Sequence, residues 1–499
     1  MHHAPDRSDP RLVAANDRPV RGDGRYVLYW MRANRRTIDN FALDRAVARC
    51  RALGRPLLVF EGLRCDYPWA ADRHHAFVLA GMRDNRQACL DAGITYHGHV
   101  AREPGADRGL LRALADHACV VVTDLHPGFH YPRMLEAAAR ALPVRVEAVD
   151  ACGLVPLSAV PSAAPTAYAF RRALQRLLPD ALGTMPAAAP LRSRGLGGAP
   201  LPAEIAARWP AVDDALLRGD AAALARLPID HGAGVVALPG GPRAALARLR
   251  RFVDARLDDY AQARNHPDHD AGSGLSPYLH FGHVSPHTVL RAIARRFEWS
   301  PADLGALRNG AREGYWGLPA PVEAFLDQLV TWRELGHNFA AHRDDIDRFE
   351  SLPSWAQATL AAHAGDPRPW RYDLDALTEA RTHDPLWNAA QTELRERGVM
   401  HNYLRMLWAK LVLQWSATPR EALASLIELN NRWALDGRDP NSYSGILWTF
   451  GRYDRPWGPA RPVFGTVRCM TSDSARRKLD LEQYLERWGA QRSLVSRSG

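Results

Sequence analysis

The chain has 499 residues, 46% of them hydrophobic and 24% charged, which is enough for roughly two or three domains with buried cores. Its 64 Lys and Arg against 55 Asp and Glu give a net charge of +9, which is compatible with a polyanionic partner such as DNA. No stretch reaches the ~18 apolar residues that cross a bilayer, and the first residues lack the apolar core of a secretory signal. We therefore expect a cytoplasmic protein, a monomer without a membrane partner.

The first part of the chain predicts an α/β domain over residues 25–150, after an N-terminal tail of residues 1–24. Short apolar runs alternate there with helical patterns, and this alternation is typical of a parallel sheet with βαβ connections, as in nucleotide-binding domains. The apolar runs are Tyr26–Trp30, Pro56–Phe60 and Cys119–Thr123, and the helical patterns are Phe41–Leu53 and Arg73–Leu90.

The middle of the chain, residues 151–235, predicts a linker that contains some helix. Pro, Ala and Gly are enriched in Thr184–Pro190 and Gly195–Pro200, and this composition disfavours regular packed elements. From Pro242 onward the periodicity is helical almost throughout. We assign residues 236–490 to an all-α domain and residues 491–499 to a C-terminal tail.

Common catalytic signatures are missing from the sequence. It contains no phosphate-binding G-x-x-x-x-G-K-[ST] loop, no H-E-x-x-H motif and no Gly-rich dinucleotide fingerprint after the first strand, so nucleotide hydrolysis and zinc proteolysis lose support. The six cysteines are scattered without a Cys-x-x-Cys pair, and we expect buried thiols and no metal site.

Tryptophan, arginine and asparagine are instead concentrated in a few helical segments. The motifs are Arg381–Gln391 and Met400–Lys410 with Trp415, together with Tyr29–Arg32, Ser273–Gly282, Asn430–Asn431, Asp436–Pro440 and Arg461–Gly465. In these motifs and their order, from about Tyr26 to Trp488, the sequence resembles class II DNA photolyases of the photolyase/cryptochrome family.

The resemblance implies an antenna-type α/β domain followed by a helical domain that binds FAD and DNA. It implies a deoxyribodipyrimidine photo-lyase, in which light-excited reduced FAD gives an electron to a flipped-out cyclobutane pyrimidine dimer, the ring splits and the electron returns. A second chromophore, a deazaflavin or a folate, is an open possibility. A cryptochrome-like photoreceptor and a light-independent DNA-binding flavoprotein are the alternatives, and the short chain after Trp488 favours the enzyme.

Residues before and within Ser273–Gly282 are the expected floor of the flavin site. The hydroxyls of Ser273 and Ser276 suit a diphosphate, although helix capping explains the same pattern. By the resemblance, Tyr260, Arg264 and Leu275 line the flavin.

Three polar side chains match the family's positions beside the isoalloxazine. Arg405 and Asp436 form the family's ion pair, which favours an anionic reduced ring, and Asn430 faces flavin N5 as a neutral hydrogen-bonding group. Without the resemblance, a surface Arg and a turn Asp explain the first two. Asn431 is adjacent and remains an alternative to Asn430.

A second set of residues is aromatic. Trp408 and Trp415 are seven residues apart and share one face of a predicted helix. Such a stripe is typical of a core. By the resemblance, Trp387, Trp408 and Trp415 also form the chain that carries electrons from solvent to oxidised flavin.

The third set concerns the substrate, and it departs from the family at one position. Gln328 stands where the family usually has a glutamate that contacts the dimer. Trp332, four residues on, and Trp448 are expected to form an apolar wall for flipped-out pyrimidines. Asp327 should point elsewhere, ~100° around the helix. Arg455 and Arg468 are expected to contact phosphates, with a solvated charged loop as the alternative.

Overall fold

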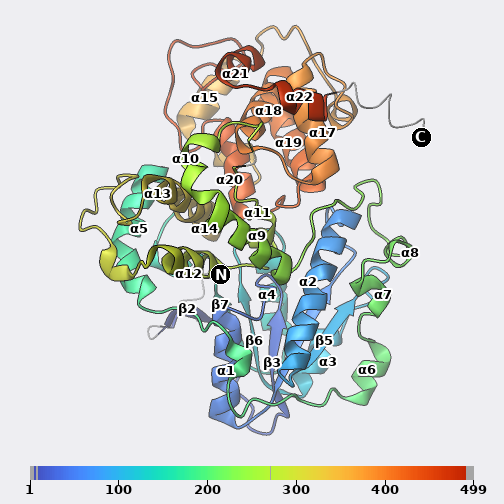
Figure 1. Ribbon diagram of the computed structural model, residues 1–499. Coiled ribbons are helices and arrows are strands. Elements are labelled where there is room, and N and C mark those ends of the chain that lie inside the picture. Colours follow the sequence, from blue (N-terminus) through green and yellow to red (C-terminus); the bar gives the residue numbers. More distant parts are fainter. Residues whose placement is uncertain (1–4, 7–8, 270, 490–499) are drawn as a thin grey trace.

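A computed structural model describes residues 5–6, 9–269 and 271–489 of the chain. An α/β half lies below a helical half in Figure 1, and the predicted C-terminal tail lies outside the described residues. No helix of the described part combines the length and the apolar character that crossing a membrane requires.

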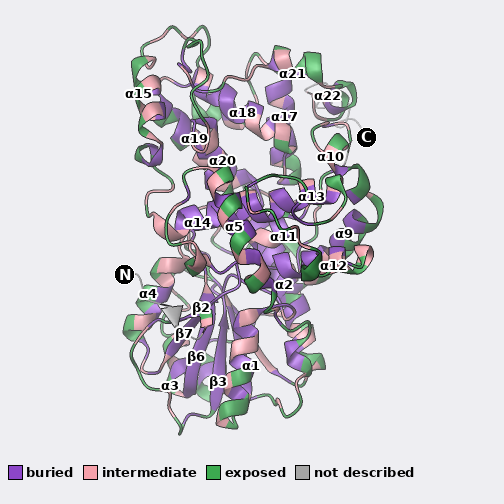
Figure 2. Cartoon of the chain, turned by 90° about the vertical axis from the view of Figure 1, so that its left-hand side faces the viewer, coloured by how far each residue is buried: buried purple, intermediate pink, exposed green. Residues whose placement is uncertain are grey.

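The α/β half is built on one sheet with strand order β1-β2-β7-β6-β3-β4-β5. Strands β7, β6, β3, β4 and β5 run parallel to one another, as the sequence predicts. The apolar strands are buried in the middle of this half, and helices cover them (Figure 2). The strands are β1 (Pro5–Asp6), β2 (Asp9–Ala14), β3 (Tyr26–Met31), β4 (Leu57–Leu63), β5 (Thr95–Val100), β6 (Ala118–Leu125) and β7 (Val146–Asp150).

The edge strand β2 departs from two expectations, because it runs antiparallel to β7 and lies within the predicted tail of residues 1–24. Leu12 pairs with Val149 and is buried. The guanidinium of Arg11 donates to three carbonyls after β7, those of Asp150, Gly153 and Leu154. The six residues of β2 show almost no alternation of apolar and polar side chains, so the sequence pattern does not reveal the strand. It is defined by its pairing with β7.

The helices of the α/β half connect the parallel strands. Helix α1 covers the predicted range, because the Asn40 side chain accepts from the N–H groups of Ala42 and Leu43 at its start and Gly54 ends it at φ 60°. Helix α2 (Asp72–Asp91) extends the predicted Arg73–Leu90 by one residue at each end. The helices of this half are α1 (Phe41–Leu53), α2, α3 (Leu110–Asp116) and α4 (Tyr131–Ala141).

The connecting region contains one long helix, α5 (Ala167–Leu182), and three short ones. Arg171 of α5 forms a buried ion pair with Asp327 of the helical half, with an Nε–Oδ1 distance of 2.7 Å. The segment thus packs against the helical half besides linking the halves. The short helices are α6 (Ala203–Arg208), α7 (Asp214–Leu217) and α8 (Ala221–Leu224).

The helical half begins with α9, and its core consists of two clusters of apolar side chains, one that includes α9, α12 and α13 and one around α17, α18 and α19. Its helices are α9 (Pro242–Ala255), α10 (Tyr260–Ala263), α11 (Ser276–His280), α12 (Pro286–Phe297), α13 (Ala320–Leu326), α14 (Arg333–His342), α15 (Ser354–Ala362), α16 (Leu374–Thr378), α17 (Pro385–Arg397), α18 (Asn402–Trp415), α19 (Pro419–Trp433), α20 (Pro440–Thr449), α21 (Ser472–Lys478) and α22 (Glu482–Trp488). Between α13 and α14 lies a π-helical segment, η5 (Asp327–Trp332).

Candidate functional site

A cavity of about 870 Å³ opens in the helical half, between α10, α13, η5, α18 and α20. This volume lies in the range of pockets that hold large organic ligands. It gathers most of the residues singled out in the sequence: Tyr260, Arg264, Ser273, Leu275, Ser276, Gln328, Trp332, Arg405, Trp408, Asn430, Asp436, Trp448 and Arg468. Four of the candidates considered, Trp387, Trp415, Asn431 and Arg455, do not line it.

One wall of the cavity carries a bidentate ion pair between α18 and the turn after α19. The Arg405 guanidinium donates to both carboxylate oxygens of Asp436, at 3.0 and 3.3 Å. The side chains are 24% and 13% exposed. A guanidinium held in this way presents a fixed positive charge to the cavity.

The two neighbouring asparagines of α19 have different surroundings. Asn431 is fully buried, and its amide donates to Tyr443 while its oxygen accepts from the Arg438 N–H. Asn430 lines the cavity and donates to Ser442 at 2.8 Å and to Asn431 at 3.2 Å. No donor of the described residues reaches the oxygen of Asn430, so this atom is the free acceptor of the pair.

The loop before α11 contributes the floor of the cavity. The Ser273 hydroxyl accepts from the Leu275 N–H at 3.3 Å, which leaves its own hydrogen to donate. No side chain caps the start of α11, so the capping alternative does not explain these serines. Nearby, the guanidinium of Arg264 lies 5.6 Å from the ring centre of the buried Tyr260.

The opposite wall is formed by η5 and α20. Gln328 and Trp332 of η5 line the cavity, and so does Asp327, although both of its carboxylate oxygens accept hydrogen bonds from the Arg171 guanidinium. The segment is π-helical rather than the regular helix that the spacing assumed, and such wide turns occur often at functional sites. The rings of Trp332 and Trp448 lie 5.3 Å apart at an angle of 38°.

A glycine permits this approach of the two helices. A Cβ atom at Gly336 of α14 would lie 2.6 Å from the Cα of Asn441 at the start of α20, closer than real contacts allow. The absence of a side chain there lets α14 and α20 touch, and the contact brings Trp332 and Trp448 together at the cavity.

Trp457 also lines the cavity and is 38% exposed, which places it at the mouth. The guanidinium carbons of Arg455 and Arg468 lie 4.8 and 4.9 Å from its ring centre. Arg455 therefore belongs to the mouth although it does not line the cavity. Cations on an aromatic face at an opening suit an anionic polymer.

Behind the cavity, three tryptophans follow one another through the core. Trp408 lines the cavity and stacks on Trp387 with ring centres 6.3 Å apart and planes within 8°. Trp387 in turn meets Trp415 edge-on at 5.6 Å. The three rings are between 1% and 3% exposed. Trp387 lies on α17, whereas Trp408 and Trp415 lie on α18. In space Trp387 is nevertheless the middle ring of the three.

Sequence reasoning missed Lys410, which lies in one of the quoted motifs but received no role. It lines the cavity, is 2% exposed and donates to the carbonyl of Thr449, next to Trp448. Burial lowers the pKa of Lys410 to about 7. The sequence could have pointed to Lys410, because it lies two residues after Trp408 on the same predicted helix, and a lysine among buried helix positions needs a partner.

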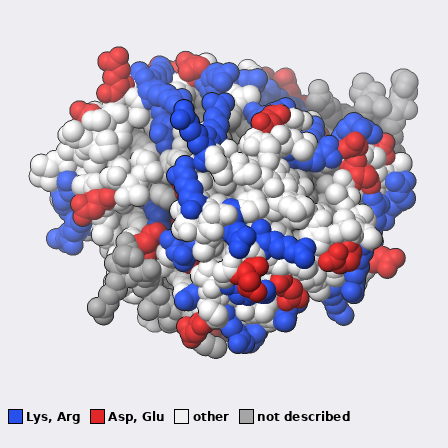
Figure 3. All heavy atoms as spheres, turned by 90° about the horizontal axis from the view of Figure 1, so that it is seen from below, with Lys and Arg blue, Asp and Glu red and all other residues white. Residues whose placement is uncertain are grey.

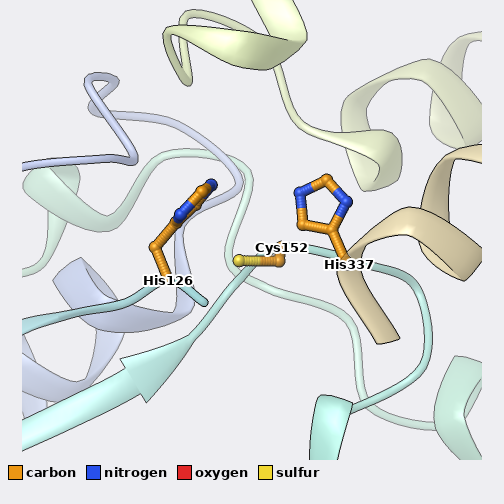
Figure 4. Close-up of side chains that lie close together, drawn as sticks. All are labelled: His126, Cys152 and His337. Carbon is orange, nitrogen blue, oxygen red and sulfur yellow. The ribbon is translucent and has the colours of Figure 1, made fainter. Parts of the chain in front are cut away.

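A cluster of His126, Cys152 and His337 joins the two halves (Figure 4). Their side-chain N and S atoms lie within 4.8 Å of one another. The Gly128 N–H donates to Nδ1 of His126, and Nδ1 of His337 bonds to the carbonyl of Arg333. These bonds place the proton of His126 on Nε2 and leave Nε2 of His337 an acceptor. Nε2 of His337 has no hydrogen-bond partner among the described residues, and burial lowers the pKa of both rings.

Basic residues also gather away from the cavity. Figure 3 looks at the end formed by the α/β half, where Lys and Arg side chains form a band across the face with acidic side chains near its edges. The positive net charge is therefore not confined to the cavity mouth.

Comparison with known sequences gives consistent matches. A profile described as DNA photolyase matches residues 27–190. A protein named deoxyribodipyrimidine photo-lyase from Methanothermobacter thermautotrophicus is 34% identical over 466 residues, which are 93% of this chain and 94% of that one. Proteins of the same name from Potorous tridactylus and Arabidopsis thaliana are 33% and 32% identical and match 95% and 92% of this chain, and 83% and 88% of their own lengths.

A comparison of structures agrees with the architecture. The crystal structure of a bacterial class III photolyase from Agrobacterium tumefaciens superimposes with a TM-score of 0.67, covering 93% of this chain and 86% of that one. At 20% identity this match supports the fold alone.

Proposed function

This chain belongs to the DNA photolyase family, and from that premise we propose that it is a class II enzyme that uses light and FAD to split cyclobutane pyrimidine dimers in DNA. The family supports a photo-lyase and photolyase-type DNA repair.

The observation that carries the proposal is that one cavity joins two different walls. One wall presents the fixed guanidinium of Arg405 and the free oxygen of Asn430, and the other presents the indoles of Trp332 and Trp448. A charged redox ring and a pair of flat, apolar bases need these two kinds of surface side by side.

The first wall fits FAD. When bound, the flavin supplies the light absorption and the electron that opens the dimer. Arg405, fixed by Asp436, favours negative charge on the ring. The oxygen of Asn430 accepts an N–H hydrogen bond and adds no competing charge. The hydroxyls of Ser273 and Ser276 on the cavity floor suit phosphate oxygens.

The second wall fits the lesion. Extruded pyrimidines are held by stacking and by hydrogen bonds to their edges, and Trp332, Trp448 and Gln328 supply both kinds of contact. Arg455 and Arg468 at Trp457 are placed to hold the flanking phosphates. Behind the first wall, Trp408, Trp387 and Trp415 offer a path by which electrons reach the cavity from outside.

Two measurements test the proposal. Purified protein should show the absorption of noncovalent FAD at near-stoichiometric amount, and any second chromophore would add its own band. The reduced protein should convert dimers in an oligonucleotide under blue or near-ultraviolet light and not in darkness. Protein that neither contains nor takes up FAD contradicts the proposal.

The ion pair gives a sharper test. Asp436→Ala should weaken FAD retention by about tenfold or more, because hydrogen bonds to charged groups are typically worth ~1.5–3 kcal/mol. Asp230→Ala is the matched control, since Asp230 pairs with Arg432 at 2.8 Å outside the cavity. Equal FAD dissociation constants for the two variants would remove Asp436 from the site.

A cryptochrome-like photoreceptor is the second candidate, and Gln328 favours it because the family usually has a glutamate there. Both candidates bind FAD, so the repair assay separates them. FAD binding and photoreduction without light-dependent loss of dimers would favour the photoreceptor. Dimer-specific binding without any light-dependent product would favour a DNA-binding flavoprotein.

A further inference from the structure

Three side chains of types that bind metal ions converge where the two halves meet. His126 directly follows β6 and Cys152 follows β7, at the carboxyl edge of the parallel sheet, and His337 comes from the middle of α14. Their candidate ligand atoms lie within 4.8 Å of one another, and Figure 4 shows the two imidazoles on either side of the sulfur. The three positions are far apart in the chain, so no spacing motif predicts them, and the expectation of no metal site rested on such motifs.

The free lone pair of this cluster belongs to His337. Its Nδ1 bonds to the Arg333 carbonyl at 3.1 Å and therefore carries the proton, whereas Nε2 has no hydrogen-bond partner among the described residues. The residue is 1% exposed, and its ring turns a nitrogen toward His126 and Cys152 (Figure 4). Buried polar atoms without a partner are rare in proteins. A cation at this place would satisfy Nε2.

Cys152 adds a soft ligand to the two imidazoles. Its thiol donates to the Leu125 carbonyl at 3.4 Å, and the residue is 3% exposed. Thiolate ligands select soft cations, and two histidines with one cysteine in a trigonal set are typical of copper. No fourth histidine, cysteine or carboxylate within the described part of the chain belongs to the group. Structural zinc, by contrast, almost always has four ligands.

The charges around the cluster favour a monovalent ion. Asp439 and Arg333 act on both histidines and carry opposite charges, and Arg333 is held by a hydrogen bond to the Cys152 carbonyl at 2.7 Å. The thiolate of Cys152 then balances one positive charge. A divalent ion would leave a buried charge without a partner, which is costly.

We propose that His126, Cys152 and His337 bind one Cu(I) ion, which links the carboxyl edge of the sheet to α14. The inference goes beyond the proposed function and does not depend on it. A metal with bonds of ~2.0–2.3 Å holds its ligand atoms ~3.5 Å apart, so the three side chains close on the ion by roughly 1 Å.

Binding changes the protonation of two side chains. The S–H bond of Cys152 breaks, its proton leaves to solvent and a Cu–S bond forms. Copper enters as Cu(I), so no electron is transferred. The Gly128 N–H, which donates to Nδ1 of His126 at 3.1 Å, gives up this acceptor, because Nδ1 either binds the ion itself or carries the proton when Nε2 binds it.

The ion would stabilise the contact between the two halves. His337 lies next to Gly336, through which α14 touches the start of α20. A ligand that binds only the folded chain raises its stability. The midpoint of thermal unfolding should therefore rise when Cu(I) is bound.

The experiment titrates the full chain, as purified and without oxygen, with Cu(I) delivered as its bicinchoninate complex. The wild type should take up one Cu(I) per chain, and X-ray absorption at the copper edge should show two nitrogens and one sulfur. Cys152→Ala should weaken Cu(I) binding by at least about a hundredfold, since even the partners of metal ligands contribute ~10–100-fold. Cu(I) should raise the unfolding midpoint of the wild type and not that of Cys152→Ala.

Cys89→Ala is the matched control, because Cys89 is a fully buried cysteine of α2 outside the group, and its removal should leave Cu(I) binding unchanged. No uptake by the wild type, a copper edge without sulfur, or equal Cu(I) affinities of Cys152→Ala and Cys89→Ala overturns the inference. If Cys152→Ala fails to fold, His337→Phe decides, since it keeps a flat ring and removes the free lone pair. An unchanged affinity in His337→Phe overturns the site, and tighter binding of Zn(II) than of Cu(I) in a parallel titration overturns the choice of ion.

Discussion

The tryptophans at the cavity and behind it form two groups that differ in how far they are buried. Trp332 and Trp448 are half-buried, tilted by 38° to each other and open to the cavity. Trp387, Trp408 and Trp415 are buried, and the first two are fixed by indole hydrogen bonds to the Trp408 carbonyl and the Gln391 side chain.

The difference shows what each environment allows the same side chain to do. An indole with an open face can stack on a base, and its contact area is available to a ligand. A buried indole with its N–H bonded is fixed in place. Of this group Trp408 lines the cavity, whereas Trp387 and Trp415 lie among other rings and core side chains. Substitutions in the two groups should therefore affect different measurements.

The largest effect is expected at the centre of the buried group. Trp387→Phe should slow photoreduction of oxidised flavin by at least about tenfold, which corresponds to ~1.4 kcal/mol in barrier, because among the described residues Trp387 is the one aromatic ring that contacts both Trp408 and Trp415. Repair by chemically pre-reduced enzyme should stay close to wild type. Flash photolysis and a repair assay measure the two quantities.

Trp332→Phe is the matched control, with the opposite expectation of normal photoreduction. Thermal unfolding of both variants checks stability, because shrinking a buried aromatic ring can cost a few kcal/mol. An unchanged photoreduction rate in Trp387→Phe would show that the three buried tryptophans have a purely structural role.

The next effect concerns the open group. Trp448→Ala should weaken binding of dimer-containing DNA by about tenfold to a hundredfold, since stacking on an aromatic ring is worth ~1–3 kcal/mol per base. Binding of undamaged DNA should change little. Trp488→Ala, outside the cavity on α22, should change neither. Equal losses on damaged and undamaged DNA would show that Trp448 does not contact the lesion.

The sequence predicted those parts whose signals are local. Helix α1 came out with its observed ends because an asparagine cap and a glycine stop lie beside the apolar pattern. The central strands were found from apolar runs, whereas the edge strand β2 was missed because its pairing with β7 spans more than a hundred residues.

Most of the residues that line the cavity could be predicted, because they lie in or near the sequence motifs. Their arrangement in space could not be predicted. The position of Trp387 between Trp408 and Trp415 arises from packing of α17 against α18. The rings of Tyr372 and His383 contact Trp415 at 5.4 and 5.2 Å between ring centres, but they lie in a segment without periodicity, so the sequence pattern did not predict this contact. The sequence could not distinguish Asn430 from Asn431. The hydrogen bonds of the two side chains show that the oxygen of Asn430 is the free one.

Lys410 lies between the two tryptophan groups and allows a test by pH. Its pKa is about 7 in the folded chain because of burial, against ~10.4 in an unfolded chain. Between these values the unfolded chain binds the extra proton, so stability rises with pH. Relative to Lys410→Met, the wild type should gain roughly 2 kcal/mol of unfolding free energy from pH 7 to pH 9.

Denaturant unfolding at both pH values measures this change, and Lys478→Met on α21 is the control because Lys478 is exposed. The control should show no difference in its pH dependence from the wild type. A parallel pH dependence of Lys410→Met and wild type would show that Lys410 titrates in the folded chain as it does in water.

The smallest effect is expected at Gln328, which lies on the open wall beside Trp332. As an amide, Gln328 can donate one hydrogen bond to a dimer carbonyl but cannot share a proton with a dimer that has gained an electron. A carboxylic acid can, and a hydrogen bond to a charged group is worth ~1.5–3 kcal/mol. Gln328→Glu should therefore raise the yield of repaired dimers per absorbed photon while the dissociation constant for dimer-containing DNA stays similar.

Both quantities are to be measured on one oligonucleotide with fully reduced flavin, because the mutation acts on the competition between ring splitting and return of the electron. Gln87→Glu makes the same change of charge at an exposed position of α2 and should alter neither quantity. A gain that also appears in Gln87→Glu would be a general effect of charge. An unchanged or lower yield in Gln328→Glu would mean that residue 328 does not contact the lesion, or that the surrounding wall has adapted to the amide.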